Sequence, residues 1–417
     1  MIRGAFVASW VAAMLVLVHA ARAEPHDIET YALGNGLAVV LAPDPGVTSV
    51  VATMRYRVGS ADDPQGRAGL AHLIEYVASR GSRHVAEVDK LLDEAGGWAS
   101  AMTSATATTF VESVPATSLE LALYVEADRM AAPAQQGLEA ARGALAAERD
   151  EADRMIEAAL WPQRAPSLGT TGDLAAVTPA ELARRWTERY EPGAATLVIA
   201  GRFEPREVRA LVQRYFGWIP SHPHAAAPRA TVQPLAAPVE LATTSLVPRV
   251  TMAFRIAEVP SSVPVSAPEL AIAARLLGTG RSARLYRRLV VADHLATAVH
   301  VEIVPEAGEL TIGVELRDPA GASAARAAIR DELARLREAP VDSGELARGA
   351  HLTERELFVG LENLAFRAAE LAEAPVAPRR LADLRAGLAE VTPASLQRAV
   401  QHWLADSAAV TLTSSPP

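Results

Sequence analysis

The sequence contains no cysteine in its 417 residues. Disulfide bonds and thiolate-bound metals are therefore excluded, so any metal has to be held by nitrogen and oxygen ligands such as histidine and carboxylate. Lysine is almost absent too, because Lys90 is the only one beside many arginines. Together with the abundant alanine, this indicates a bias of genomic base composition, and we infer no function from it.

Positive charge is scarce relative to negative charge. The chain has 40 basic and 49 acidic residues, which gives a formal net charge of -9. This balance disfavours a nucleic-acid partner, because phosphate backbones are bound by clustered basic side chains. The content of 50% hydrophobic and 21% charged residues is typical of a globular protein. The length suits two domains of roughly 200 residues better than one core.

Long hydrophobic runs are missing beyond the N-terminal segment. Residues 1–23 carry Arg3, an apolar run from Ala5 to Val18 and the pattern Ala21-Arg22-Ala23, as in a cleavable secretory signal peptide. The run is shorter than the roughly 20 residues that a membrane-spanning helix needs. We expect a mature chain that begins near Glu24, is exported to the periplasm and has no membrane span.

The order of strand and helix patterns is typical of an α+β fold. Strand patterns with a hairpin signal cover 30–58, further strands are expected at 98–115 and 195–200, and helices at 69–79, 85–95, 118–130, 138–160 and 179–190. A proline-rich linker is expected at 220–238. Val177-Thr-Pro-Ala-Glu-Leu182 recurs 214 positions later (391 - 177) as Val391-Thr-Pro-Ala-Ser-Leu396. We therefore predict two homologous domains, residues 24–219 and 239–417.

One predicted helix carries a metal-site pattern. In Gly69-Leu-Ala-His-Leu-Ile-Glu-Tyr76, the side chains of His72 and Tyr76 project from one helix face, with Glu75 beside them. The octapeptide differs by one side chain from H-x-x-E-H, in which two histidines hold zinc and the glutamate activates a bound water. Tyrosine stands in place of the second histidine. By itself, His-x-x-Glu is common in helices by chance.

The surrounding sequence makes the pattern specific, because the chain resembles the pitrilysin/insulinase family of zinc peptidases, especially the paired-domain members akin to mitochondrial processing peptidase. The resemblance runs through 33–40, 57–64, 69–76, 96–104, 161–169 and 276–286. It implies two homologous α/β sandwich domains that close as a clamshell. It also implies that extended peptides add to a sheet edge in the cavity and are cleaved at zinc, with Glu75 as the general base.

The resemblance also implies a third zinc ligand on a later helix. Aligning Asp128-Arg129-Met130 and the residues after it places this ligand at Glu148, with Glu151 as the alternative if the helix is shifted by one turn. The family's additional glutamate, seven residues before the ligand, is here Ala141. The expected metal ligands are therefore His72, Glu148 and, as a poor donor, Tyr76.

Tyrosine and histidine differ as zinc ligands. A phenol has an ordinary pKa near 10, whereas a neutral imidazole coordinates at pH 7 without losing a proton. With only two firm ligands, zinc binding is expected to be weak or lost. In the second half, the arginine and tyrosine that bind substrate in many relatives align with Val290 and Thr297, and nearby Arg284 and Tyr286 are out of register.

Plainer interpretations compete with these assignments. His72 can be a hydrogen-bonded helix residue, Glu75 half of an ion pair, Tyr76 a packing aromatic and Glu148 part of a solvated face. His84, and His222 and His224 in the linker, are not expected to be ligands. Two hypotheses follow. In one, the chain is a non-catalytic or weakly active subunit that binds peptides or supports a homologous or identical partner. In the other, it is an active zinc peptidase with an altered site.

Overall fold

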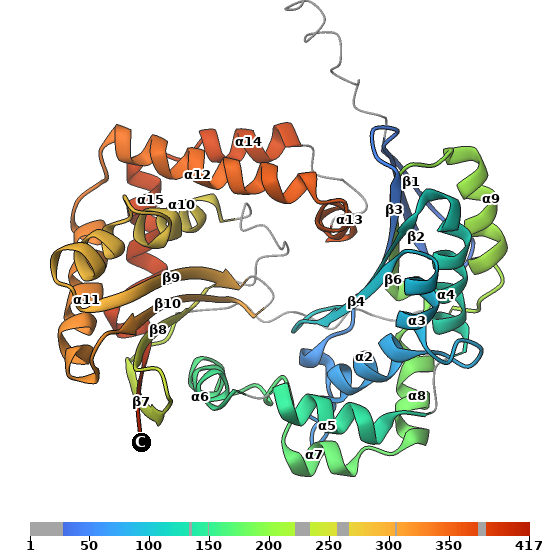
Figure 1. Ribbon diagram of the computed structural model, residues 1–417, viewed down its shortest axis with the longest axis horizontal. Helices are drawn as coiled ribbons and strands as arrows, with labels where there is room; N and C mark the ends of the chain where they lie inside the picture. The colour runs from blue at the N-terminus through green and yellow to red at the C-terminus, as the bar shows by residue number, and fades with distance from the viewer. Residues whose placement is uncertain are drawn as a thin grey trace, which may run out of the picture.

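The computed structural model describes residues 28–132, 136–148, 150–221, 234–256, 267–304, 307–373 and 381–417. The predicted signal peptide, most of the predicted linker, and His222 and His224 lie outside these ranges. Two lobes stand side by side, each built on its own mixed sheet with helices packed on it (Figure 1). The expected pair of α/β domains arranged as a clamshell is confirmed.

The N-terminal sheet has six strands in the order β1-β2-β6-β3-β5-β4. Only β2 and β6 pair in parallel. Part of the predicted hairpin at 30–58 is present, because β1 and β2 pair antiparallel. The strand β3 does not pair with β2, since β6 lies between them. All seven residues of β6 are buried, which suits this central position. The strands are β1 (Glu29–Ala32), β2 (Ala38–Pro43), β3 (Ser49–Tyr56), β4 (Trp98–Thr103), β5 (Thr108–Pro115) and β6 (Ala195–Gly201).

The helices of the first half differ from the sequence prediction in two ways: α7 and α9 were not predicted, and one predicted helix is divided. The helix expected at 138–160 is two helices, since the side chain of Asp150 accepts hydrogen bonds from the N–H groups of Ala152 and Asp153 and starts a new helix. The helices are α2 (Leu70–Arg80), α3 (Val88–Glu94), α4 (Leu119–Ala131), α5 (Leu138–Glu148), α6 (Glu151–Leu160), α7 (Thr171–Ala176), α8 (Pro179–Arg189) and α9 (Pro205–Phe216).

The C-terminal sheet repeats this topology. Its order, β7-β11-β8-β10-β9, matches β2-β6-β3-β5-β4 strand for strand, including one parallel pair at the same place. The strands are β7 (Val239–Thr244), β8 (Arg249–Arg255), β9 (Ala296–Val304), β10 (Glu309–Leu316) and β11 (Ala409–Ser415), and the helices are α10 (Pro268–Gly278), α11 (Ala322–Glu338), α12 (Ser343–Glu362), α13 (Leu364–Glu373), α14 (Leu381–Ala389) and α15 (Pro393–Trp403).

The repeated sequence motif has the same structural role in both halves. Thr178 caps α8 and Thr392 caps α15, each with its side-chain oxygen accepting a backbone N–H and with proline in the first turn. Each helix leads through a short 3-10 turn into a buried strand, β6 or β11. Local sequence signals and the sheet order therefore both indicate two homologous halves.

Each half contributes a helix to the other half's sheet. Helix α13 packs on β3 and β6 through Ala368, Leu371 and Ala372 (Figure 1). In return, α6 packs on β7, β8 and β11, and its Ile156 and Leu160 join Val410 and Leu412 of β11 in one apolar cluster. This exchange joins the two lobes through buried apolar contacts.

The chain leaves α6 at a junction that contains a partly buried acid. The indole N–H of Trp161 donates to the Glu309 carboxylate at 3.3 Å, and Arg255 and Arg164 stack on the indole ring, 4.5 and 3.7 Å from its centre. Burial raises the pKa of Glu309 from 4.5 to about 7, although the Trp161 hydrogen bond opposes the shift. The native state therefore favours the protonated acid.

Replacing Glu309 by glutamine is expected to stabilise the protein only at high pH. Because the folded pKa is raised, the stability associated with this carboxyl is fully present below about pH 4.5 and is lost as the pH rises through about 7. Glutamine keeps an oxygen for the Trp161 indole. The free energy of unfolding should match wild type at pH 4.5 and exceed it by about 1–2 kcal/mol at pH 8.5. Urea denaturation at both pH values measures this. Glu315→Gln, at an exposed ion pair on the same strand, should show no such difference.

Among the helices that the structure describes, none is both long and apolar enough to cross a membrane.

Candidate functional site

Helix α2 is held rigidly at its N-terminus. Gly69 has φ 82°, and a Cβ there would lie 2.9 Å from the Gly169 nitrogen, so both its conformation and its surroundings require glycine. One carboxylate oxygen of Asp63 accepts the N–H of Ala71 at 3.0 Å, which satisfies a free donor of the first turn. The apolar face of the helix, including Leu73 and Val77, lies in the core. The helix consequently holds the side chains of His72, Glu75 and Tyr76 in fixed positions.

His72 is a buried, neutral imidazole. Its side chain is 8% exposed, and its Nδ1 has no hydrogen-bond partner in the part of the chain that the structure describes. Burial lowers its pKa, while the charge of Glu148 and the nearby backbone of Ser167 and Thr103 oppose that shift. A buried nitrogen with no partner is unfavourable. This atom is therefore the strongest indication that the helix once held, or can hold, a ligand.

Glu75 lies beside His72 and is equally buried. Burial raises the pKa of its carboxyl from 4.5 to about 7; a hydrogen bond with the Thr103 side chain opposes the shift, and the charge of Glu148 adds to it. Among the described residues, Glu75 forms no ion pair, which was one of its two sequence interpretations. A carboxyl that titrates near neutral pH has the property of a general base.

Tyr76 donates its hydroxyl hydrogen to a carboxylate oxygen of Glu148. Burial, this hydrogen bond and the negative charge of Glu148 all raise the pKa of the phenol. The phenol is therefore neutral at pH 7. Tyr76 also packs against the N-terminal core, as one of its two sequence interpretations predicts. Its hydrogen bond to Glu148 is a further role that the sequence did not indicate.

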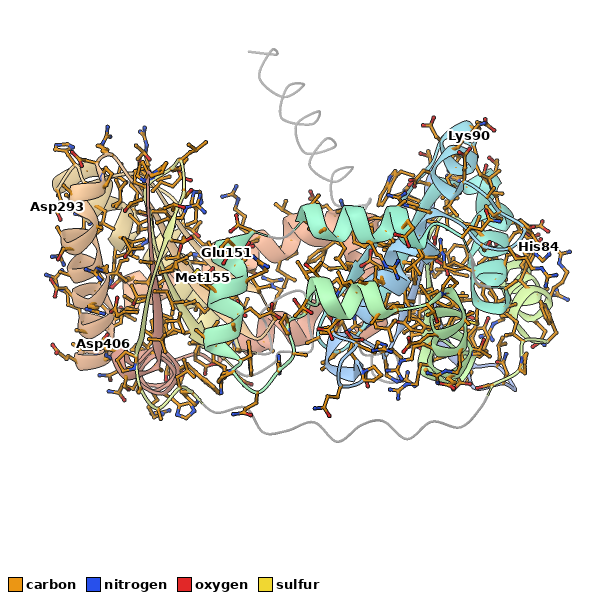
Figure 2. The ribbon with its side chains drawn as sticks, turned by 90° about the horizontal axis from the view of Figure 1, so that it is seen from below. His84, Lys90, Glu151, Met155, Asp293 and Asp406 are labelled. Carbon is orange, nitrogen blue, oxygen red and sulfur yellow. The ribbon has the colours of Figure 1, made fainter. Side chains whose placement is uncertain are left out.

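Glu148 is the last residue of α5 and reaches the motif helix, whereas Glu151 does not. Because the chain begins a new helix at residue 151, Glu151 lies on α6, which packs on the C-terminal sheet, and pairs with Arg154 (Figure 2). Ala141 is fully buried in the N-terminal core. Of the two alternatives for the third ligand, the structure places Glu148 near His72 and Tyr76.

These side chains do not fit a catalytic zinc site. Such a site needs three protein ligands and an open position. His72 supplies one nitrogen and Glu148 one carboxylate, but that carboxylate already accepts a hydrogen from a neutral phenol. Across the described ranges, no group of three or more histidine, aspartate or glutamate side chains is placed to hold a metal ion.

The second half does not supply a free arginine at the expected positions. Val290 packs against the C-terminal core, and the hydroxyl of Thr297 donates to the Glu315 carbonyl at 3.4 Å. The side chain of Arg284 forms an ion pair with Glu345, in which the guanidinium makes two hydrogen bonds of 2.8 and 2.6 Å to the carboxylate. Tyr286 begins a π-helical turn that runs to Ala292.

His84 is separate from the site. It lies at the outer end of the N-terminal lobe (Figure 2), where its Nδ1 is 2.5 Å from Asp128. The contact that sequence reasoning missed is Thr103, at the end of β4, which touches both His72 and Glu75. Its only signal in the sequence was the threonine-rich strand pattern after Trp98.

Two family models match the chain. One, described as insulinase (peptidase family M16), matches residues 38–167, and the other, described as the peptidase M16 inactive domain, matches residues 176–352. An uncharacterized zinc protease of Mycobacterium leprae is 30% identical over 200 residues, which are 44% of this chain and 45% of that protein. The matched part thus spans less than half the length of this curated relative.

Solved structures share the whole fold. A protease from Helicobacter pylori superposes with a TM-score of 0.82 at 20% identity, covering 94% of this chain and 99% of that one. The first half of the periplasmic protease PqqL from Escherichia coli gives a TM-score of 0.73 at 18% identity, covering 94% and 93%. At these identities the likeness concerns the fold alone.

Proposed function

Because the chain belongs to the insulinase (M16) family of peptidases, we propose that it is a peptide-binding subunit with little or no hydrolytic activity of its own. The observation that carries this proposal is the hydrogen bond from the Tyr76 hydroxyl to Glu148. A zinc site would need His72, Glu148 and the residue at position 76 as ligands. The hydrogen bond joins the last two of these to each other and keeps Tyr76 as a neutral hydrogen-bond donor. His72 and Glu75 remain in place without a complete set of metal ligands.

Peptide binding is supported by the position of β4. This strand is at the edge of the N-terminal sheet, and its last residue, Thr103, contacts the His72–Glu75 pair. An edge strand offers unpaired backbone N–H and C=O groups to which an extended peptide can add as a further strand. A peptide bound there would pass beside the altered site.

A homologous partner and export complete the proposal. The second half holds neither arginine nor tyrosine in the expected register, so we propose that the chain acts with a homologous second subunit or with an identical copy. The signal pattern at residues 1–23, and the periplasmic location named for the Escherichia coli relative, support export to the periplasm. We propose domain boundaries at 24–219 and 239–417, with a linker at 220–238.

Two observations favour a second function, that of an active zinc peptidase with an altered site. The buried Nδ1 of His72 has no partner among the described residues, and Glu75 titrates near pH 7 beside it. In this alternative, His72, Glu148 and Tyr76 hold the metal and Glu75 is the general base.

A cleavage assay separates the two functions. The purified mature chain is incubated with a mixture of unstructured peptides, alone and with a co-expressed homologous partner, and the products are identified by mass spectrometry. We expect the chain alone to cleave no faster than its Glu75→Gln variant. Cleavage by the chain alone that is abolished both by a chelator and by Glu75→Gln would establish the active peptidase instead.

A further inference from the structure

Two large apolar side chains are exposed on edge strand β4. Side chains alternate along a strand, so Ala99 and Ala101 pack toward the N-terminal core while Trp98 and Met102 point to the opposite face. They are 47% and 51% exposed. Exposed apolar residues on an edge strand favour aggregation, and natural proteins usually replace them with charged residues or cover them. Their presence here indicates a surface that is covered in use.

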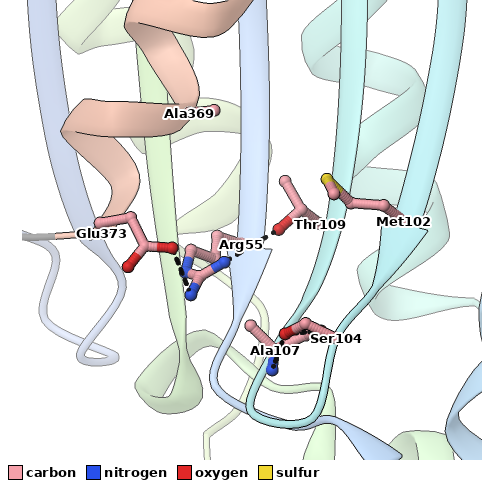
Figure 3. A pocket seen from close by; sticks show the side chains of 7 residues that line it. All are labelled: Arg55, Met102, Ser104, Ala107, Thr109, Ala369 and Glu373. Carbon is pink, nitrogen blue, oxygen red and sulfur yellow. Dashed lines mark hydrogen bonds and ion pairs between the residues drawn. The ribbon is translucent and has the colours of Figure 1, made fainter. Parts of the chain in front are cut away.

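A small pocket lies next to Met102 on the same face of the sheet (Figure 3). Its walls come from β3, β4 and β5, from the turn between β4 and β5, and from α13 of the other half. Its lining includes Met102, Ala107, Thr109, Ala369, Arg55 and Glu373. The two charged members form an ion pair with an N–O distance of 2.6 Å, and both side chains are largely buried. Their charges offset each other, so the pocket favours an uncharged, apolar side chain over a charged one.

We propose that β4 binds an extended peptide that carries two apolar side chains four residues apart, one lying on Trp98 and the other lying on Met102 at the mouth of the pocket. The inference rests on the proposed peptide-binding function and specifies the peptides that this site prefers. Trp98 and Met102 are four residues apart on one face, which is about 13 Å at roughly 3.3 Å per residue. A paired strand has the same rise, so its residues match this spacing only at i and i+4.

The residue between the two apolar positions faces a different environment. Ser100 lies between Trp98 and Met102 on the exposed face and is small and polar. It offers no apolar contact, so the side chain opposite it can be small or polar. Met102 is followed directly by Thr103, which contacts Glu75. Of the two apolar positions of the peptide, the pocket position is therefore nearer to the altered site along the strand, although Met102 and Thr103 point to opposite faces of β4.

Binding of synthetic peptides to the mature chain tests this inference. Fluorescein-labelled nonapeptides of serine and threonine carry leucine at positions 3 and 7, at positions 3 and 6, or at neither, and binding is followed by fluorescence anisotropy. The 3,7 peptide should bind about 5- to 20-fold more tightly than the 3,6 peptide, because the second leucine of the latter points to the wrong face. The leucine-free peptide should bind most weakly.

Three variants locate the binding surface. Trp98→Ser and Met102→Ser should each weaken binding of the 3,7 peptide by about 5- to 20-fold and leave the leucine-free peptide unchanged. Trp218→Ser is the matched control, since Trp218 is 66% exposed at the end of α9, away from β4, and its loss should change neither affinity.

The outcomes separate this inference from the function on which it rests. If the wild-type chain binds no peptide, the proposed peptide-binding function is wrong, and the inference fails with it. If the chain binds the 3,7 and 3,6 peptides equally, or if Trp98→Ser and Met102→Ser bind like wild type, peptide binding stands and the spacing rule is wrong. The peptide series on wild-type protein decides this even if a variant does not fold.

Discussion

Replacing Tyr76 by histidine is expected to raise the zinc affinity of the chain by about 100-fold or more. Even changes to residues that only support a metal ligand typically alter affinity 10- to 100-fold, and this change adds a ligand directly. Histidine at this position projects from the same helix face as His72, one turn away. It also removes the phenol that donates to Glu148, which frees that carboxylate. Titration of the chelator-stripped protein with zinc, followed by calorimetry, measures the gain.

Two further variants isolate the cause of that gain. Tyr76→Phe removes the hydroxyl without adding a ligand, so it should free Glu148 yet leave zinc affinity near the wild-type value. Tyr124→His adds a histidine to α4 at a partly exposed tyrosine outside the site and should bind no zinc. If Tyr76→His binds zinc no more tightly than Tyr76→Phe and Tyr124→His do, the positions of His72 and Glu148 are not suited to a metal. The tyrosine at position 76 would then not be the cause of the lost zinc binding.

Replacing Arg129 by methionine is expected to destabilise the N-terminal lobe by about 3–5 kcal/mol. Arg129 is 1% exposed, and one of its nitrogens lies 2.9 Å from Glu112 and 2.6 Å from Glu126, two fully buried carboxylates. Burial acts to lower the pKa of Arg129, but the charges of Glu126 and Glu112 outweigh this and raise it. Burial and the charge of Glu126 in turn raise the pKa of Glu112. Methionine keeps the volume and leaves two acids without their cation.

Arg129 also connects the buried ion-pair cluster that it forms with Glu112 and Glu126 to α2, the helix that carries His72 and Glu75. Its Nε donates to the Ala78 carbonyl of α2 at 3.0 Å, and its guanidinium lies 4.4 Å from the centre of the Phe110 ring. Urea denaturation followed by circular dichroism measures the loss. Arg184→Met is the matched control, because Arg184 and Glu188 form a solvent-exposed pair, and such pairs contribute little to stability. An Arg129→Met loss as small as that of the control would show that the cluster does not stabilise the lobe.

The fold was largely predictable from local sequence signals. The two threonine-proline motifs, Thr178-Pro179 and Thr392-Pro393, begin equivalent helices, and the sheet orders of the two halves match. What local signals could not give was the placement of distant segments. Helix α13 belongs to the second half in sequence and packs on the first sheet, because small side chains such as Ala368 let it approach β3 and β6 closely. Periodicity alone carries no information about such a partner.

The candidate site was predictable as a set of residues but not as a set of contacts. His72, Glu75 and Tyr76 follow from helical spacing, and Glu148 from family resemblance. The break after Glu148 was missed, since 138–160 has continuous helical character and only the cap at Asp150 interrupts it. That break places Glu148 next to Tyr76 and puts Glu151 on a different helix, where it pairs with Arg154. The hydrogen bond from Tyr76 to Glu148 depends on how α2 and α5 pack, so no pattern within either helix indicates it.

The zinc content of the purified mature chain is the most direct test of the view that Tyr76 has replaced a metal ligand. The protein is equilibrated with zinc, dialysed against metal-free buffer and analysed by inductively coupled plasma mass spectrometry. We predict far less than one zinc per chain, with an unfolding temperature that a chelator does not change. One zinc per chain, retained through dialysis and required for thermal stability, would contradict this account.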